Sequence, residues 1–414
     1  MPEAAMRERL RAILPFEPTG GQWRAVAEIE EDLAATKPML RLLQGDVGAG
    51  KTAVGFAACL AVASARGQVA WMVPTEMLAI QHARTLDSWC RSAGLRLAVL
   101  TSRMPVARRR RIVEQIASAQ IDLVVGTHAL LSEDVAFARL GLAVIDEQHR
   151  FGVAQRALLR AKGTTPHLLV MTATPIPRTL ALTSYGELDV SLIRELPPGR
   201  TPSQTKLFAG TRVLAKAREQ LAKHIEQGAQ AFVVCPRIER VGAQDISHVE
   251  DAAEWLRERL PGHGVGVIHG KLATGALEDA VAKFARGELA VLVATTVIEV
   301  GIDLPNARAM LIEHADRFGL AQLHQLRGRI GRAAGGTSWC LLHTKQAPSS
   351  DAHRRLSVLV EAHDGFRVAE MDLELRGPGE IFGTRQAGSP GMFAACLTGP
   401  GIELLLAARE TART

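Results

Sequence analysis

The sequence has little that would support disulfide bonds or a structural metal. It contains only five cysteines among 414 residues, and no two of them form a Cys-x-x-Cys pair. An odd number of widely separated cysteines is typical of a reducing compartment and argues against disulfides and zinc. The five are Cys59, Cys90, Cys235, Cys340 and Cys396.

Long hydrophobic segments are also missing. The longest apolar stretch, Ala53–Ala65, is shorter than the ~20 residues needed to cross a bilayer. Met1–Arg11 is charged and has no apolar core of the kind found in signal peptides. We therefore expect a cytoplasmic protein with no membrane partner.

Charge gives only weak information. The formal net charge of +6 and the pI of about 9.3 suit a polyanionic partner, but they are also common among ordinary enzymes. Arg108–Arg111 is the one run of like charge, and we interpret it as a solvated helix face rather than as a phosphate contact.

Short apolar runs alternate with longer helix-like segments along the chain, a pattern typical of parallel sheets covered by helices. With 47% hydrophobic residues, the chain can form two or three domain cores. The expected strands of the first half are 39–43, 69–73, 97–100, 121–125, 142–145 and 168–171. Those of the second half are 231–235, 265–268, 290–294, 310–312 and 339–342.

The segment Glu195–Pro202 contains three prolines, which cannot continue a helix or a central strand, so it reads as a connector between two α/β lobes. After about Thr344 the pattern changes to a helical stretch and then to a glycine-rich loop from Leu375 to Gly383. The predicted divisions are an N-terminal extension (1–15), a first lobe (16–195), a linker (196–204), a second lobe (205–345) and a C-terminal element (346–414).

The sharpest local signal is a G-x-x-x-x-G-K-T phosphate loop between an expected strand and an expected helix. Its glycines let backbone N–H groups face phosphates. Lys51 would reach the terminal phosphates of a nucleoside triphosphate such as ATP, and the Thr52 hydroxyl would hold Mg²⁺. The loop consists of Gly45, Asp46, Val47, Gly48, Ala49, Gly50, Lys51 and Thr52.

Two carboxylates, Asp146 and Glu147, directly follow the apolar run Leu142–Ile145. The carboxyl end of a parallel strand is where a magnesium ligand and a water activator belong. We assign the Mg²⁺ contact to Asp146 and the orientation of the attacking water to Glu147. A surface acidic turn is the alternative.

An arginine-rich segment in the second lobe, Gln325–Arg332, places Arg329 and Arg332 three residues apart, which predicts one helix face. Arginines donated to a γ-phosphate from another lobe stabilise the charge of phosphoryl transfer and contribute ~10³–10⁵ in rate. If these two arginines act in this way, hydrolysis requires the lobes to close. A solvent-exposed arginine cluster is the alternative.

Taken together, these segments resemble superfamily 2 helicases, and more narrowly the RecG family of ATP-dependent DNA helicases. The resemblance runs from about Leu14 to Gly388 and implies two tandem RecA-like lobes. The transcription-repair coupling factor has a similar motor, but Leu43–Gln44 and Leu375–Glu380 look more like RecG. The segments that carry the resemblance are 42–52, 146–153, 171–181, 293–306 and 317–332.

The resemblance also implies roles for individual residues. Gln22 would read adenine, Asp303 would approach the nucleotide from the second lobe, and Gln325 would join the catalytic set. Thr172 and Thr174 would couple the ATP site to the DNA track. Hydroxyls and backbone N–H groups that hold phosphates give sequence-independent DNA binding, although threonines are also common helix caps. The implied DNA contacts are Thr75, Glu76, Thr127, His128, Thr295 and Thr296, with Arg376 and Arg385 in a translocation motif that spans Glu370 to Gln386.

Only residues 1–15 precede the adenine segment, where the RecG family carries a wedge domain that splits DNA junctions. The sequence leaves open whether the chain is a fragment or a short protein. The resemblance implies a translocase that acts on duplex or branched DNA in recombination and fork repair. We expect a monomer, to which a protein partner could supply the wedge. Two alternatives stay open, an RNA helicase and an ATP- and DNA-binding regulator that does not unwind.

Overall fold

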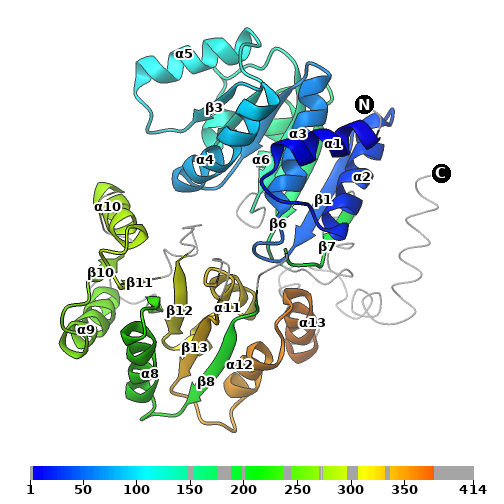
Figure 1. The fold of residues 1–414 in the computed structure, drawn as a ribbon. Helices are drawn as coiled ribbons and strands as arrows, with labels where there is room; N and C mark the ends of the chain where they lie inside the picture. The colour runs from blue at the N-terminus through cyan, green and yellow to red at the C-terminus, as the bar shows by residue number, and fades with distance from the viewer. Residues whose placement is uncertain are drawn as a thin grey trace, which may run out of the picture.

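Two parallel β-sheets, each covered by helices, form two lobes that lie one above the other in Figure 1. The computed structural model describes residues 3–147, 153–174, 188–197, 201–236, 244–269, 272, 274–295, 306–331 and 336–376.

The first sheet has the strand order β3-β4-β2-β5-β6-β1-β7, and all of its neighbouring strands are parallel. Its strands are β1 (Leu40–Gly45), β2 (Gln68–Met72), β3 (Leu97–Leu100), β4 (Leu123–Gly126), β5 (Leu140–Asp146), β6 (His167–Thr172) and β7 (Asp189–Ile193). The helices are α1 (Glu3–Ile13), α2 (Gly20–Ala34), α3 (Lys51–Ser64), α4 (Glu76–Ala93), α5 (Val106–Ala117) and α6 (Val153–Arg160), with a 3₁₀ turn η1 (His128–Leu131).

Alternate residues of the central strands enter two different cores, which is why these strands read as continuous apolar runs. On β5, Leu142 and Val144 pack with helices α1 to α4 on one face. Ala143 and Ile145 pack with α5, η1 and α6 on the other face. Burial on both faces fixes the strand register, so the loops at the carboxyl ends of the strands are held in place.

The second sheet has the order β10-β11-β9-β12-β13-β8, again with parallel neighbours. Helices α8 and α9 cover one face, and α10 to α13 cover the other. Its strands are β8 (Gln204–Ala209), β9 (Gln230–Val234), β10 (Val265–Ile268), β11 (Val291–Ala294), β12 (Ala307–Ile312) and β13 (Trp339–Thr344). The helices are α8 (Leu214–Glu226), α9 (Gln244–Arg259), α10 (Thr274–Ala285), η4 (Ala315–Arg317), α11 (Leu320–Arg327), α12 (Asp351–Glu361) and α13 (Gly365–Arg376).

The expected fold class is confirmed, and every strand expected from the sequence is present. Two further strands, β7 and β8, were not expected. They lie at the edges of the two sheets and flank the proline-rich connector. Both strands mix polar and apolar residues, because each is only partly buried.

The C-terminal element begins with the helical stretch that the sequence predicts. Helix α13 continues through Leu375 to Arg376, so the start of the expected glycine-rich loop is helical instead. Residues 377–414, including Arg385, lie outside the described residues. Within the described part of the chain, no helix combines the length and apolar character needed to cross a membrane.

Candidate nucleotide site between the two lobes

The phosphate loop connects β1 to α3 at the carboxyl edge of the first sheet. Gly48 and Gly50 have φ values of 77° and 82°, a left-handed conformation that glycine adopts without strain. Helix α3 begins at Lys51, so its free N–H groups and positive dipole end face the loop. The Lys51 Nζ donates hydrogen bonds to the carbonyl oxygens of Gly45 (2.8 Å) and Asp46 (2.9 Å).

The side-chain amide of Gln22 supports the phosphate loop. Gln22 lies on α2 with only 1% of its surface exposed. Its Nε2 donates to the Ala49 carbonyl at 2.8 Å, and its Oε1 accepts from the Thr19 N–H at 2.9 Å. Thr19 completes a capping box with Gln22. A Cβ on Gly50 would lie 2.1 Å from the Gln22 Nε2, so this close approach requires glycine. The amide supports the loop, a role that the sequence did not indicate.

Asp146 and Glu147 lie at the end of β5, on the same sheet edge as the phosphate loop, as their sequence positions predict. Glu147 has a φ of 55°, a left-handed conformation that is rare for a residue with a side chain and that clusters at functional sites. Its N–H donates to the Asp146 Oδ1 at 3.0 Å. This backbone geometry was not evident from the sequence.

His82 is a member of the site that sequence reasoning missed. Its Nε2 lies 2.9 Å from the Asp146 Oδ2. The ring also packs against Trp71, with 5.5 Å between the ring centroids. A lone histidine on a helix carries no sequence signal for this role, because the contact depends on how α4 packs beside β5.

Burial and charge act in opposite directions on the ionisable groups of the site. Desolvation alone would raise the pKa of Asp146, but the hydrogen bond and charge of His82 and the charge of Lys51 hold that pKa below its ordinary value. Desolvation lowers the pKa of the Lys51 ammonium, although Glu147 and Asp146 oppose this shift. Arg329 lowers the Lys51 pKa further because both groups are positively charged.

Arg329 comes from the second lobe and lines the same cavity as Lys51, Thr52, Asp146 and Glu147. The expected helix face is wrong, because α11 ends at Arg327 and Arg329 lies in the turn beyond it. Gly331, with a φ of 68°, follows in a conformation that cannot continue a helix. Arg332 lies outside the described residues, and the partly buried Gln325 is on α11.

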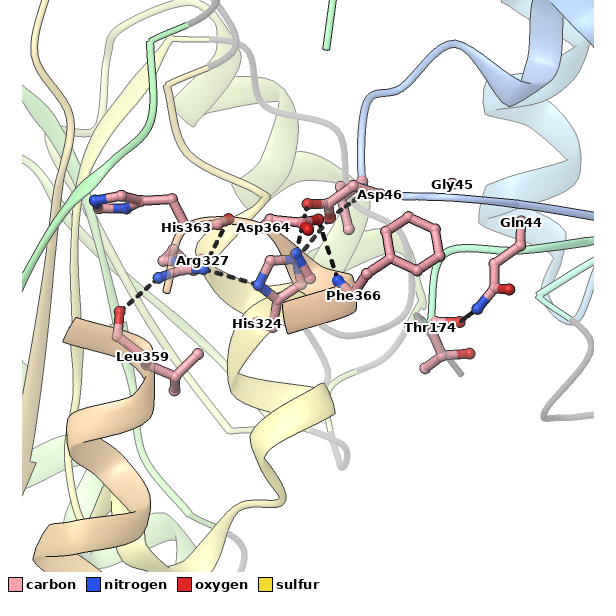
Figure 2. A network of polar contacts seen from close by, with 12 residues as sticks. Gln44, Gly45, Asp46, Thr174, His324, Arg327, Leu359, His363, Asp364 and Phe366 are labelled. Atoms are coloured by element: carbon pink, nitrogen blue, oxygen red, sulfur yellow. Dashed lines mark hydrogen bonds and ion pairs between the residues drawn. The ribbon is translucent and has the colours of Figure 1, made fainter. Parts of the chain in front are cut away.

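The backbone of the second lobe closely approaches the phosphate loop. A Cβ placed on Gly328 would lie 2.6 Å from the Val47 Cβ. Between the same two segments, the His324 Nε2 lies 2.6 Å from the Asp46 Oδ1 (Figure 2). Neither contact was expected from the sequence, and both bring the lobes together at the site.

The residues predicted to contact DNA follow the ends of strands, but several of them already form hydrogen bonds within the chain. Thr75 caps α4 by accepting the Leu78 N–H, which is the capping role weighed as its alternative. Glu76 accepts the Arg103 N–H at 3.0 Å. His128 is exposed and lies 3.4 Å from the Ser102 hydroxyl.

Two predicted DNA contacts are buried. Thr127 is 1% exposed, and its hydroxyl has no hydrogen-bond partner within the part of the chain that the structure describes. Thr295 is 5% exposed and follows β11 in the second lobe. Thr296, Asp303 and Arg385 lie outside the described residues, and Arg376 is placed only as the last residue of α13.

Thr172 and Thr174 lie beside the phosphate loop. Their hydroxyls are 2.5 Å apart, and the Thr174 N–H donates to the Thr172 Oγ1 at 3.1 Å. The Gln44 amide, at the end of β1, donates to the Thr174 carbonyl at 3.4 Å (Figure 2). The coupling role predicted for the two threonines remains a prediction.

Comparison with known proteins agrees with this two-lobed arrangement. Residues 19–183 match the DEAD/DEAH box helicase family, and residues 213–334 match the helicase conserved C-terminal domain. The chain is 49% identical over 418 residues to the ATP-dependent DNA helicase RecG of Synechocystis, covering 100% of this chain and 49% of that protein. It is also 49% identical to RecG of Escherichia coli K12, covering 93% of this chain and 56% of the relative.

The chain is a RecG-like superfamily 2 helicase motor region. A solved structure of RecG bound to a three-way DNA junction superimposes with a TM-score of 0.78 at 40% identity, covering 97% of this chain and 52% of that one. The helicase MrfA, solved with DNA and AMPPNP, shares the fold at 16% identity and a TM-score of 0.68. The RecG-like chain spans about half the length of the curated relatives it matches.

Proposed function

We propose that the chain is the motor of an ATP-dependent DNA helicase or translocase, which moves along duplex or branched DNA as its lobes open and close. The observation that carries this proposal is the position of Arg329. It reaches from the second lobe into a cavity that Lys51 and Glu147 line from the first lobe. Catalytic groups divided between two lobes can act together only when the lobes meet, so hydrolysis is tied to movement.

The charges of this cavity favour a nucleoside triphosphate. Two cations, Lys51 and Arg329, line the same cavity, and the repulsion between them contributes to the lowered pKa of Lys51. A polyphosphate between them would remove that repulsion and accept hydrogen bonds from the N-terminus of α3. In this role Lys51 binds the terminal phosphates, Arg329 stabilises the charge that develops on the transferred phosphoryl group, and Glu147 orients the attacking water.

Thr52 and Asp146 form a suitable donor set for Mg²⁺, which prefers oxygen ligands and is usually shared between one or two protein groups and substrate phosphates. The lowered pKa of Asp146 keeps its carboxylate ionised. No cluster of three or more His, Cys, Asp or Glu that could hold a metal alone occurs among the described residues. Held by these two residues, the ion would neutralise negative charge on the phosphates.

DNA is favoured over RNA as the track by the RecG structure with 40% identity, which holds a three-way DNA junction. Loops after β2, β4 and β11 would hold phosphates without reading bases. Such a track predicts an affinity that falls steeply with salt as counterions are released. A protein partner could supply a wedge for strand separation.

The test compares steady-state ATPase with branched DNA, duplex DNA and RNA, and adds displacement of a triplex strand. We expect stimulation by DNA, displacement that depends on ATP, and loss of both in Lys51→Ala. Stimulation by RNA alone would favour an RNA helicase. Hydrolysis without displacement would favour the regulator, and stimulated ATPase in Lys51→Ala would contradict the site.

A further inference from the structure

A continuous chain of hydrogen bonds crosses between the lobes, beside the nucleotide cavity (Figure 2). It starts at the phosphate loop, where the Asp46 Oδ1 lies 2.6 Å from the His324 Nε2. The other ring nitrogen, His324 Nδ1, lies 2.9 Å from Arg327. Arg327 then donates to the carbonyl oxygens of Leu359 (2.6 Å) and His363 (3.1 Å). The phosphate loop is thus joined through α11 to α12 and to the turn before α13.

The direction of these bonds follows from chemistry. A guanidinium can only donate, so the His324 Nδ1 must accept from Arg327 and carries no proton. The imidazole proton therefore resides on Nε2, which donates to the Asp46 carboxylate. Arg327 selects the tautomer that lets His324 reach across to the other lobe.

A second contact from the C-terminal element ends on the same carboxylate. The Gly365 N–H, at the start of α13, donates to the Asp46 Oδ2 at 3.3 Å. Close by, the Arg194 guanidinium of the first lobe lies 5.4 Å from the ring centroid of Phe366. The first turn of α13 is therefore held against the first lobe by Asp46 and Arg194.

The hydrogen bonds between the lobes are sensitive to separation of the lobes, because two of the residues that form them are buried. His324 is 3% exposed and Arg327 is 5% exposed. Burial would raise the pKa of Asp46, but the hydrogen bonds from His324 and from the Val47 N–H, together with the charge of Lys51, keep that pKa below its ordinary value, so the carboxylate stays ionised. The partly buried Asp46 carboxylate and the buried Arg327 guanidinium are bridged by one imidazole, so they stabilise each other only while both lobes are in place.

We infer that Asp46, His324 and Arg327 form an interlobe relay, which sets the position of the phosphate loop against α11 and α13 when the lobes close. These three are positioning residues, because they act through Lys51 and Arg329 and do not themselves transfer the phosphoryl group. The inference rests on the proposed motor function and adds a physical link from the ATP site to the C-terminal element. A bond that exists in only one lobe arrangement shifts the equilibrium toward that arrangement.

The test uses two substitutions of similar size at one position. His324→Asn keeps an acceptor for Arg327 but is too short to reach Asp46, whereas His324→Gln keeps a donor that can reach the carboxylate. Because the hydrogen bond to the Asp46 carboxylate across the lobes is lost only in His324→Asn, we expect its DNA-stimulated kcat to fall about tenfold and that of His324→Gln to fall less than about threefold. The KM for ATP should stay within about twofold in both.

A double-mutant cycle separates a relay from a residue that only packs. If Asp46→Ala and His324→Asn remove the same bond, the double variant will have the kcat of the slower single variant. If the kcat losses of the two single variants multiply in the double variant, the relay is overturned. Equal kcat losses in His324→Asn and His324→Gln would overturn it as well. Both conclusions hold when the wild type shows DNA-stimulated ATPase. A wild type without DNA-stimulated ATPase would instead refute the motor function itself. Thermal unfolding of each variant checks that the lobes remain folded.

Discussion

Gly328 gives the sharpest test of lobe closure, because its closest neighbour is the phosphate loop of the other lobe. A Cβ added to Gly328 would lie 2.6 Å from the Val47 Cβ and 3.0 Å from both Val47 methyl groups. The backbone φ of Gly328 is −67°, which alanine adopts without strain. Gly328→Ala therefore adds a steric conflict between the lobes and little else.

The size of the effect follows from that conflict. Forcing an extra methyl group into a packed contact costs roughly 1–3 kcal/mol, and here the lobes can relieve it by moving apart. If closure is required for hydrolysis, this cost reduces the DNA-stimulated kcat by a factor of about 5 to about 140, since 1.4 kcal/mol corresponds to tenfold. The stability of each lobe should change little.

The assay measures DNA-stimulated ATPase and thermal unfolding side by side. Gly275→Ala is the matched control, because Gly275 is exposed on α10 and a Cβ there meets no atom within 4 Å. Val47→Ala removes two of the three conflicting atoms, so combining it with Gly328→Ala should restore part of the loss. A Gly328→Ala chain with wild-type kcat would refute the view that this contact forms during turnover.

Three further predictions concern a buried histidine, two buried thiols and the hydrogen bonds of Gln22. Burial and the nearby His314 lower the pKa of His343 to about 4 from an ordinary 6.5, so the unfolded chain binds the extra proton between these values. The free energy of unfolding should therefore fall as pH drops from 6.5 to 4, and urea titrations should show a weaker dependence in His343→Phe. Burial raises the pKa of the Cys90 and Cys340 thiols to about 12, so iodoacetamide at pH 8 should modify them only after unfolding, as mass spectrometry would show. Gln22→Ala removes the side-chain half of the capping box and the bond to Ala49, and should lower the unfolding temperature by a few degrees, for a loss of about 1 kcal/mol. If calorimetry gives Gln22→Ala the same midpoint of thermal unfolding as the wild type, the support of the phosphate loop by Gln22 is contradicted.

The sequence predicted the parts of the fold that depend on local pattern. Buried central strands such as β5 are continuous apolar runs, and the phosphate loop has a fixed order of glycines, lysine and threonine. The adjacency of Asp146 to that loop followed from one rule, that carboxyl ends of parallel strands share an edge. The edge strands β7 and β8 were missed because partial burial leaves them with mixed polarity.

What the sequence could not predict depends on how separate segments meet. His82 and His324 are isolated histidines whose partners, Asp146 and Asp46, are 64 and 278 residues away. Spacing alone suggested that Arg329 would continue a helix, but the turn at Gly328 ends α11 first. The left-handed backbone of Glu147, directly after a buried strand, likewise had no signal in the sequence.

The central claim is that an arginine of one lobe completes the ATP site of the other. The most direct measurement is DNA-stimulated ATPase of Arg329→Ala beside Arg354→Ala, in which an arginine exposed on α12 is removed. We predict that Arg329→Ala lowers kcat by at least ~10³-fold, as expected for loss of an arginine that stabilises phosphoryl transfer. Arg354→Ala should keep wild-type kcat. An Arg329→Ala chain that hydrolyses ATP at the wild-type rate would contradict the account.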